Sequence, residues 1–377
     1  MKRHSHRSIL GLALFAAMAV PCAASASAER LHSPMVSDLV EGATEEVRVL
    51  LGQPTFSRAA LGHLSSDADG QVALSTLLAE FDPGSTSRAA SVLAELDGRV
   101  RALKGLPQQG APLLSARVVL PRGMRLEDVD ASSLRVAAAP MGDDRQWKTV
   151  TARAADGSST TLDAQGEVTV PVLVVGVDTR QALAEGMALV NAGLRERGLQ
   201  SADSTEPGEA LELTRLDHIR LAYDQEPNIK GAAEVFAIES GIQVSADKPE
   251  MRTFEMPWLD HDKTDYYPNQ ELVVWNKYRF GVANLQLFEE DGNTNYKVML
   301  QGLLQAVTTI VGPIEPTVAV VGSIADAVLK VMPDSWFTDD HDYIDSFYLV
   351  QRGKTYRNLQ GAGGNAMVSL SPMVVTR

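Results

Sequence analysis

Three acidic segments shape our expectation for the C-terminal half of this chain. They read DHDKTD at 260–265, FEEDGN at 288–293 and TDDHDYID at 338–345. The second follows the strand-like run Val282–Phe288, and the third precedes the strand-like run Phe347–Val350. Carboxylates placed this close together repel one another unless water, a cation or a basic partner screens them. Acidic loops at the ends of strands are what a calcium site at one edge of a β-sandwich requires.

We therefore predict that oxygen atoms from three loops converge on calcium, which takes six to eight hard oxygen ligands. The candidate ligands are Asp260, Asp262, Asp265, Glu290, Asp291, Asn293, Asp340, Asp342 and Asp345. The competing interpretation is that the loops are solvated tips that keep a β protein soluble. A helix–loop–helix calcium motif over Asp260–Glu271 is rejected, because Asp265 stands at the sixth position, where the sharp turn needs glycine.

Other chemistries have weaker support in the sequence. His218, His261 and His341 are scattered and no H-E-x-x-H occurs, although a mixed His/Asp site for a transition metal stays open. No G-x-S-x-G, P-loop or G-x-G-x-x-G is present. We therefore expect a non-enzymatic binding or structural protein. A hydrolase that uses the acidic loop face is an alternative, because catalytic residues can be far apart in sequence.

The first residues predict export. Lys2, Arg3 and Arg7 precede an apolar run at 9–20, and Ala26-Ser27-Ala28 forms an A-x-A cleavage site. Cleavage after Ala28 removes the sole cysteine, Cys22, and takes the net charge from −14 to −17. An acidic chain without cysteine is expected in the periplasm or the medium, and its charge argues against nucleic-acid partners. Partners in the envelope, in a membrane or among proteins stay open, and no pattern indicates an oligomer.

The order of patterns predicts an α+β multidomain fold. After the signal peptide 1–28, helical spacing dominates 29–110, and 111–198 reads as a small α+β unit. A polar linker is predicted at 199–229. Period-two segments then predict an antiparallel β-sandwich over 230–377, with an inserted helical hairpin at 301–332.

The hairpin 301–332 is apolar, and Gly312-Pro313 and Pro316 divide it into two short helices. Each segment is too short to span a bilayer. We expect the hairpin to pack on the sandwich, and a membrane- or envelope-interacting hairpin is the alternative.

Two resemblances accompany these patterns. The run 285–293 and the later Asp342-Tyr343-Ile344-Asp345 resemble acidic loops of synaptotagmin-type β-sandwich domains, which implies calcium binding. The segments 256–262 and 333–340 also resemble a bacterial exported family known only as a domain of unknown function (number 3103). That second resemblance implies a secreted protein and no particular activity.

Overall fold

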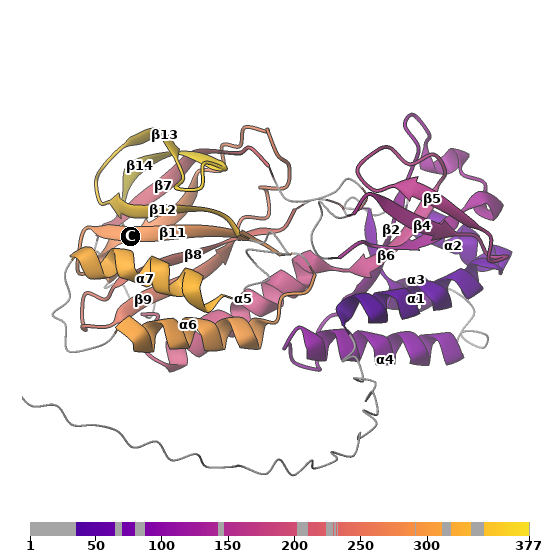
Figure 1. The fold of residues 1–377 in the computed structure, drawn as a ribbon, viewed down its shortest axis with the longest axis horizontal. Helices are drawn as coiled ribbons and strands as arrows, with labels where there is room; N and C mark the ends of the chain where they lie inside the picture. Colours follow the sequence, from indigo (N-terminus) through magenta and orange to yellow (C-terminus); the bar gives the residue numbers. More distant parts are fainter. Residues whose placement is uncertain are drawn as a thin grey trace, which may run out of the picture. The chain divides into compact units, whose positions relative to one another are not determined.

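The computed structural model describes residues 35–64, 70–79, 87–141, 147–201, 210–223, 229, 231, 233–290, 292–310, 318–332 and 343–376. Residues Pro34–Arg377 form one compact unit. The predicted signal peptide, residues 1–28, lies outside the described residues. Within the described part the fold is mixed α+β, as predicted, and its sheets and helices are shown in Figure 1.

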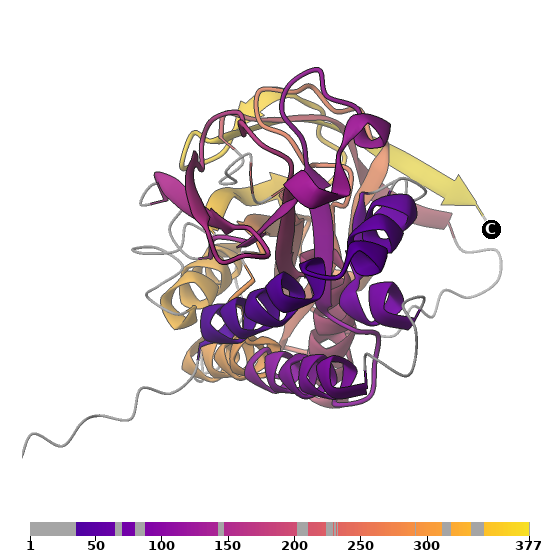
Figure 2. The same cartoon turned by 90° about the vertical axis from the view of Figure 1, so that its right-hand side faces the viewer.

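The N-terminal part is helical, as the spacing of its apolar residues predicts. It contains α1 (Val36–Leu51), α2 (Pro54–Leu64), α3 (Leu74–Ala79) and α4 (Ser87–Leu103). Along α1, the fully buried Val40, Ala43 and Val47 recur at spacings of three and four, which places them on one face. Helices α1 and α4 lie against each other, and Figure 2 shows them side by side. A short strand, β1 (Gln71–Ala73), occupies the start of a segment that the sequence predicts as helix.

A six-stranded sheet, which we call sheet I, has the order β1-β2-β6-β3-β4-β5. Its members after β1 are β2 (Leu114–Val119), β3 (Arg135–Ala138), β4 (Thr149–Arg153), β5 (Ser159–Asp163) and β6 (Val172–Val177). Strands β3 and β6 pair in parallel, and the other pairs are antiparallel. Every residue of β6 is buried, because successive side chains enter core clusters on opposite faces of the sheet.

Helix α5 (Thr179–Glu196) follows strand β6 directly and lies within the segment 111–198 that was predicted as a small α+β unit. Its N-terminus is capped by Asp178, whose Oδ1 accepts the backbone N–H of Gln181 at 2.9 Å. It ends before Gly198, whose φ of +66° is accessible to glycine at little cost.

Two four-stranded sheets make up most of the C-terminal half. Sheet II has the order β10-β7-β14-β13, and sheet III has the order β12-β11-β8-β9. The strands of sheet II are β7 (Ala210–Leu221), β10 (Gln270–Val274), β13 (Tyr356–Gln360) and β14 (Ala366–Thr376). The strands of sheet III are β8 (Val235–Ile242), β9 (Pro249–Glu255), β11 (Val282–Glu289) and β12 (Tyr343–Gln351). One buried cluster contains Leu216 and Val368 of sheet II together with Ala237 and Leu287 of sheet III, so the two sheets share a core.

The opposite face of sheet III packs against helices. Helices α6 (Tyr296–Ile310) and α7 (Val318–Val331) correspond to the predicted hairpin, with α6 starting earlier than expected. The buried face of α7 includes Val321, Ile324 and Val328, and α7 contacts β8, β11 and β12 (Figure 1). The apolar stripe of α7 is therefore used within the protein's own core. No helix among the described residues combines the length and the apolar character that crossing a membrane requires.

The main core runs through all three predicted segments. One cluster of buried residues includes Leu51 of the helical region, Leu114 and Leu183 of the α+β unit, and Phe236 and Val328 of the C-terminal half. The predicted linker 199–229 contains β7, a twelve-residue strand that pairs with both β10 and β14. The linker prediction is wrong over the residues of β7. Charged side chains alternate there with buried leucine and isoleucine residues, and the polar composition of the segment hid this apolar pattern.

Candidate functional site

The acidic residues of the first predicted calcium loop have separate protein partners. The Tyr266 hydroxyl donates to Asp260 Oδ1 at 2.7 Å, and burial together with this carboxylate raises the pKa of Tyr266 to about 12. Lys263 Nζ lies 2.5 Å from Asp262 Oδ2, and His218 Nε2 lies 2.8 Å from Asp265 Oδ1. Arg220 Nη1 also lies 3.6 Å from Asp265 Oδ2, so each of the three carboxylates has its own partners within the protein.

The residues predicted from the other two loops divide between the surface and the interior. Asn293 is exposed, whereas Glu290 and Asp345 are fully buried. Asp345 closes the glycine-rich turn before β14: its carboxylate accepts the backbone N–H groups of Gly363, Asn365 and Ala366 at 2.6, 2.8 and 2.7 Å. These hydrogen bonds satisfy backbone donors in the turn, which is a structural role.

The remaining candidate ligands, Asp291, Asp340 and Asp342, lie outside the described residues. Among the residues that are described, no three Asp, Glu, His or Cys side chains gather closely enough to hold a metal ion. The calcium site therefore stays a prediction.

A buried ionic cluster, which sequence reasoning missed, joins the end of α4 to the loop after β11. We call it the Lys104 cluster. Lys104 Nζ donates to Glu290 Oε1 at 2.5 Å and to the carbonyl oxygen of Gly292 at 2.8 Å, and both charged side chains are 0% exposed. The Tyr296 hydroxyl donates to Glu290 Oε2 at 2.8 Å, and the Gly292 N–H donates to Oε1 at 3.1 Å. Each carboxylate oxygen thus has a donor, which buried charges require.

A second buried cluster lies on strands β8 and β9, on the side of sheet III that faces sheet II. Arg252 Nε donates to Glu239 Oε2 at 2.8 Å, and Ser201 donates through its N–H and hydroxyl to Glu250. Burial is the largest effect on both carboxyls and raises the pKa of Glu239 and of Glu250. Burial likewise raises the pKa of Tyr278, whose ring packs directly over Gly241. We call these residues the Glu239 cluster.

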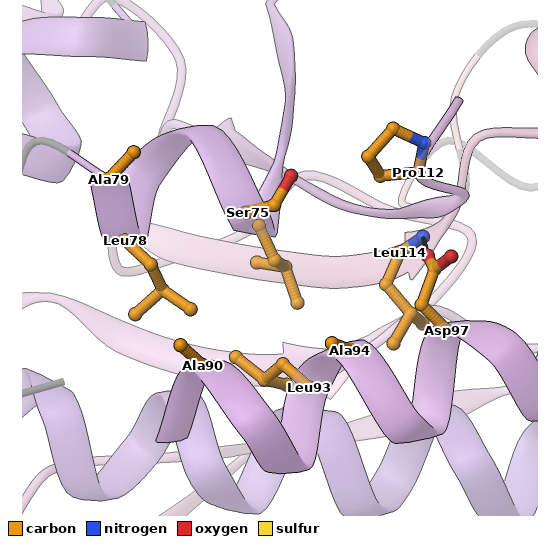
Figure 3. Close-up of a pocket in the computed structure, with 10 residues that line it drawn as sticks. Ser75, Leu78, Ala79, Ala90, Leu93, Ala94, Asp97, Pro112 and Leu114 are labelled. Carbon is orange, nitrogen blue, oxygen red and sulfur yellow. Dashed lines mark hydrogen bonds between the residues drawn. The ribbon is translucent and has the colours of Figure 1, made fainter. Parts of the chain in front are cut away.

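An apolar pocket lies between α3, α4 and the start of β2, with a cavity volume of about 500 Å³ (Figure 3). Its described lining consists of Leu74, Ser75, Leu78, Ala79, Ala90, Leu93, Ala94, Asp97, Pro112 and Leu114. The positions Ala90, Ala94 and Asp97 follow one face of α4 at helical spacing. Alanine at two of them leaves space where larger side chains would close the gap between the helices. The small residues on that face are the signal in the sequence that could have indicated the pocket.

The polar group at one end of the pocket is held in place by the backbone. Asp97 Oδ1 accepts the N–H groups of Leu113 and Leu114, each at 2.7 Å. Figure 3 shows Asp97 near Pro112 and Leu114, and Leu78 and Ala79 toward the other end. Residues 80–86, which connect α3 to α4, lie outside the described residues.

A family described as "Protein of unknown function (DUF3103)" matches residues 51–377. The chain belongs to this family. No curated protein and no solved structure matches it. The match to DUF3103 confirms the second resemblance noted in the sequence, whereas the synaptotagmin-type resemblance stays a prediction.

The DUF3103 match covers both buried clusters and the described residues that line the pocket. The description of DUF3103 assigns no ligand and no reaction, so a functional proposal has to rest on the geometry of this chain. Ligand sites in proteins are typically concave, mostly apolar and about 300–1,000 Å³ in volume. By that criterion the pocket between α3 and α4 is suited to hold a small molecule.

Proposed function

We propose that this chain is an exported, non-enzymatic protein that binds a small hydrophobic molecule in the pocket between α3 and α4. The observation that carries the proposal is the pocket itself, with a volume of about 500 Å³ and a lining dominated by leucine, alanine and proline. Transfer of an apolar ligand from water into such a lining is favourable by roughly 25 cal/mol for each Å² of apolar surface buried.

The architecture around the pocket supports a preformed site. Leu74, Leu78, Leu93 and Leu114, which form its apolar base, are each 2–5% exposed and belong to the main core cluster. Side chains held in a continuous core keep their positions, so binding requires little ordering of the protein. The rim carries the smaller and more exposed Ser75, Ala79 and Ala94.

We further propose that sheets II and III form the predicted β-sandwich and serve as a rigid scaffold rather than as the ligand site. The support is the buried cluster shared by the two sheets, together with the packing of α7 on the outer face of sheet III. Export, predicted from residues 1–28, would place the pocket where hydrophobic molecules pass through the periplasm or the medium.

Binding of N-phenyl-1-naphthylamine, an uncharged apolar dye that fluoresces on leaving water, tests the proposal. We expect saturable binding to the purified chain. Ala94→Leu places a larger side chain in the pocket and should weaken binding by about tenfold or more. A loss of ~1.4 kcal/mol of binding free energy raises the Kd tenfold.

Ala102→Leu is the matched control, because Ala102 is exposed on the same helix and does not line the pocket. Leucine is a good helix former at both positions, so neither substitution should disturb α4 by propensity. Unchanged binding by Ala94→Leu, or absence of saturable binding by the wild type, would refute the proposed function.

A further inference from the structure

The pocket lining is mostly apolar, and the charged group among its described residues lies at one end. Asp97 is the one ionisable residue among the ten described lining residues. Its side chain comes from the third turn of α4, and Oδ1 is held by the N–H groups of Leu113 and Leu114 at 2.7 Å each. The carboxylate is therefore fixed at the end of the pocket rather than swinging freely in solvent.

Two basic residues follow Asp97 on α4. Arg99 is exposed and is not among the described residues that line the pocket, and Arg101 is engaged elsewhere. Arg101, one turn beyond Asp97, is 1% exposed and donates to Glu185 and to the carbonyl oxygens of Pro107 and Ala111. Arg101 does not line the pocket. The pocket end thus presents negative charge next to apolar walls.

We propose that the pocket selects amphiphiles with a cationic head group, with the apolar chain lying between α3 and α4 and the head beside Asp97. This inference rests on the proposed function and names the ligand class of the same site. Charge complementarity is its physical basis: a cation near a carboxylate with low-dielectric walls is attracted more strongly than in bulk water. A carboxylate head group at the same place would meet like charge and is disfavoured.

The dimensions agree with a single chain lying along α4. From Ala90 to Asp97 the helix advances by about 10 Å at 1.5 Å per residue. Figure 3 shows this part of α4 running along the pocket, with Ala90 toward one end and Asp97 toward the other. A decyl chain is of comparable extended length and is a suitable probe.

Calorimetric titration of the full chain with three decyl compounds at pH 7 tests the inference. The probes are decyltrimethylammonium, decanol and decanoate, which share the chain and differ in the charge of the head. We expect decyltrimethylammonium to bind tightest and decanoate weakest, with a difference of about tenfold or more.

Asp97→Asn is the decisive variant, because its amide oxygen still accepts the N–H groups of Leu113 and Leu114 while the negative charge is lost. It should reduce the preference for the cationic over the anionic probe at least several-fold and leave decanol binding nearly unchanged. Ala94→Leu should weaken all three probes together.

The outcomes separate the two proposals. If none of the three probes binds, the proposed function fails and the inference fails with it. If decanol binds but decanoate binds as tightly as decyltrimethylammonium, or if Asp97→Asn leaves their ratio unchanged, the pocket binds apolar molecules and the cationic preference is overturned.

Discussion

Removing one partner of the Lys104 cluster should destabilise the protein strongly. Glu290→Gln keeps the size of the side chain but removes the charge that faces Lys104 Nζ at 2.5 Å, and both residues are 0% exposed. The new amide has one acceptor oxygen for the donors Lys104, Tyr296 and Gly292, and it carries no charge to compensate the buried ammonium. Breaking a buried pair in this way costs about 3–5 kcal/mol of unfolding free energy, because an uncompensated charge is left in the interior.

Two further variants separate the cost of an unpaired buried charge from the cost of lost hydrogen bonds. Lys104→Met leaves the Glu290 carboxylate with its donors Tyr296 and Gly292 and should also cost about 3–5 kcal/mol. The double variant Lys104→Met/Glu290→Leu contains no buried charge at this place, and it leaves two donors without their acceptor at about 1–3 kcal/mol each. The double variant should therefore be less destabilised than the sum of its two component single variants, Lys104→Met and Glu290→Leu, by at least about 2 kcal/mol.

Urea unfolding followed by tryptophan fluorescence measures these differences, since Trp147 lies beside sheet I and Trp275 lies in the core shared by sheets II and III. The exposed pair Arg122–Glu167, at 3.3 Å with side chains 85% and 63% exposed, is the control. Its single variants should change stability by less than about 1 kcal/mol. Additive effects of Lys104→Met and Glu290→Leu, within about 0.5 kcal/mol, would refute the argument from a buried charge.

Two further predictions concern packing and pH. A Cβ at Gly186 would lie 2.2–2.4 Å from ring carbons of Tyr296, so Gly186→Ala should lower the urea midpoint of unfolding markedly. Gly62→Ala on α2 is the control and should not lower the midpoint, because a Cβ at Gly62 meets nothing within 4 Å. Equal midpoints for the two variants would contradict the close packing of α5 on α6. The raised pKa of Glu250 means that the folded state binds the proton of this carboxyl more tightly than the unfolded state does. Glu250 therefore makes the folded protein less stable as pH rises above about 4.5, the ordinary pKa of a glutamate carboxyl. Glu250→Gln should remove this part of the pH dependence between pH 7 and 5, and identical pH profiles of wild type and variant would show that Glu250 does not contribute.

The elements that the sequence predicted well are those with a one-sided or fully buried pattern. Helices α1, α4 and α5 each carry an apolar stripe at helical spacing, and β6 is apolar throughout, so their local patterns reflect their environments. Strand β7 was missed because Leu213 and Thr214 are consecutive buried residues, opposite a register shift in β10. That irregularity breaks the period-two alternation on which strand prediction depends.

The buried clusters could not have been predicted, because their partners are distant in the sequence. Lys104 and Glu290 are separated by 186 positions. In the sequence, Glu290 belongs to an acidic run, which suggests a solvated or metal-binding loop. In the structure, Glu290 directly follows β11 and its side chain is fully buried beside Lys104. A local pattern reports how acidic a segment is, and only the fold determines which of its carboxylates meets a buried cation.

Helix α4 links the proposed ligand site to the interior of the protein. The face that carries Ala90 and Asp97 lines the pocket, and Lys104, directly after the last turn, enters the buried cluster with Glu290. A displacement of Lys104 would expose or unpair a buried charge, which costs several kcal/mol. A ligand that contacts only the part of α4 that lines the pocket makes no contact that would offset this cost. The Lys104 cluster therefore holds α4 in position whether or not a ligand occupies the pocket. This arrangement favours a rigid, preformed pocket over one that closes around its ligand, and it is why the head-group preference should follow from the fixed position of Asp97.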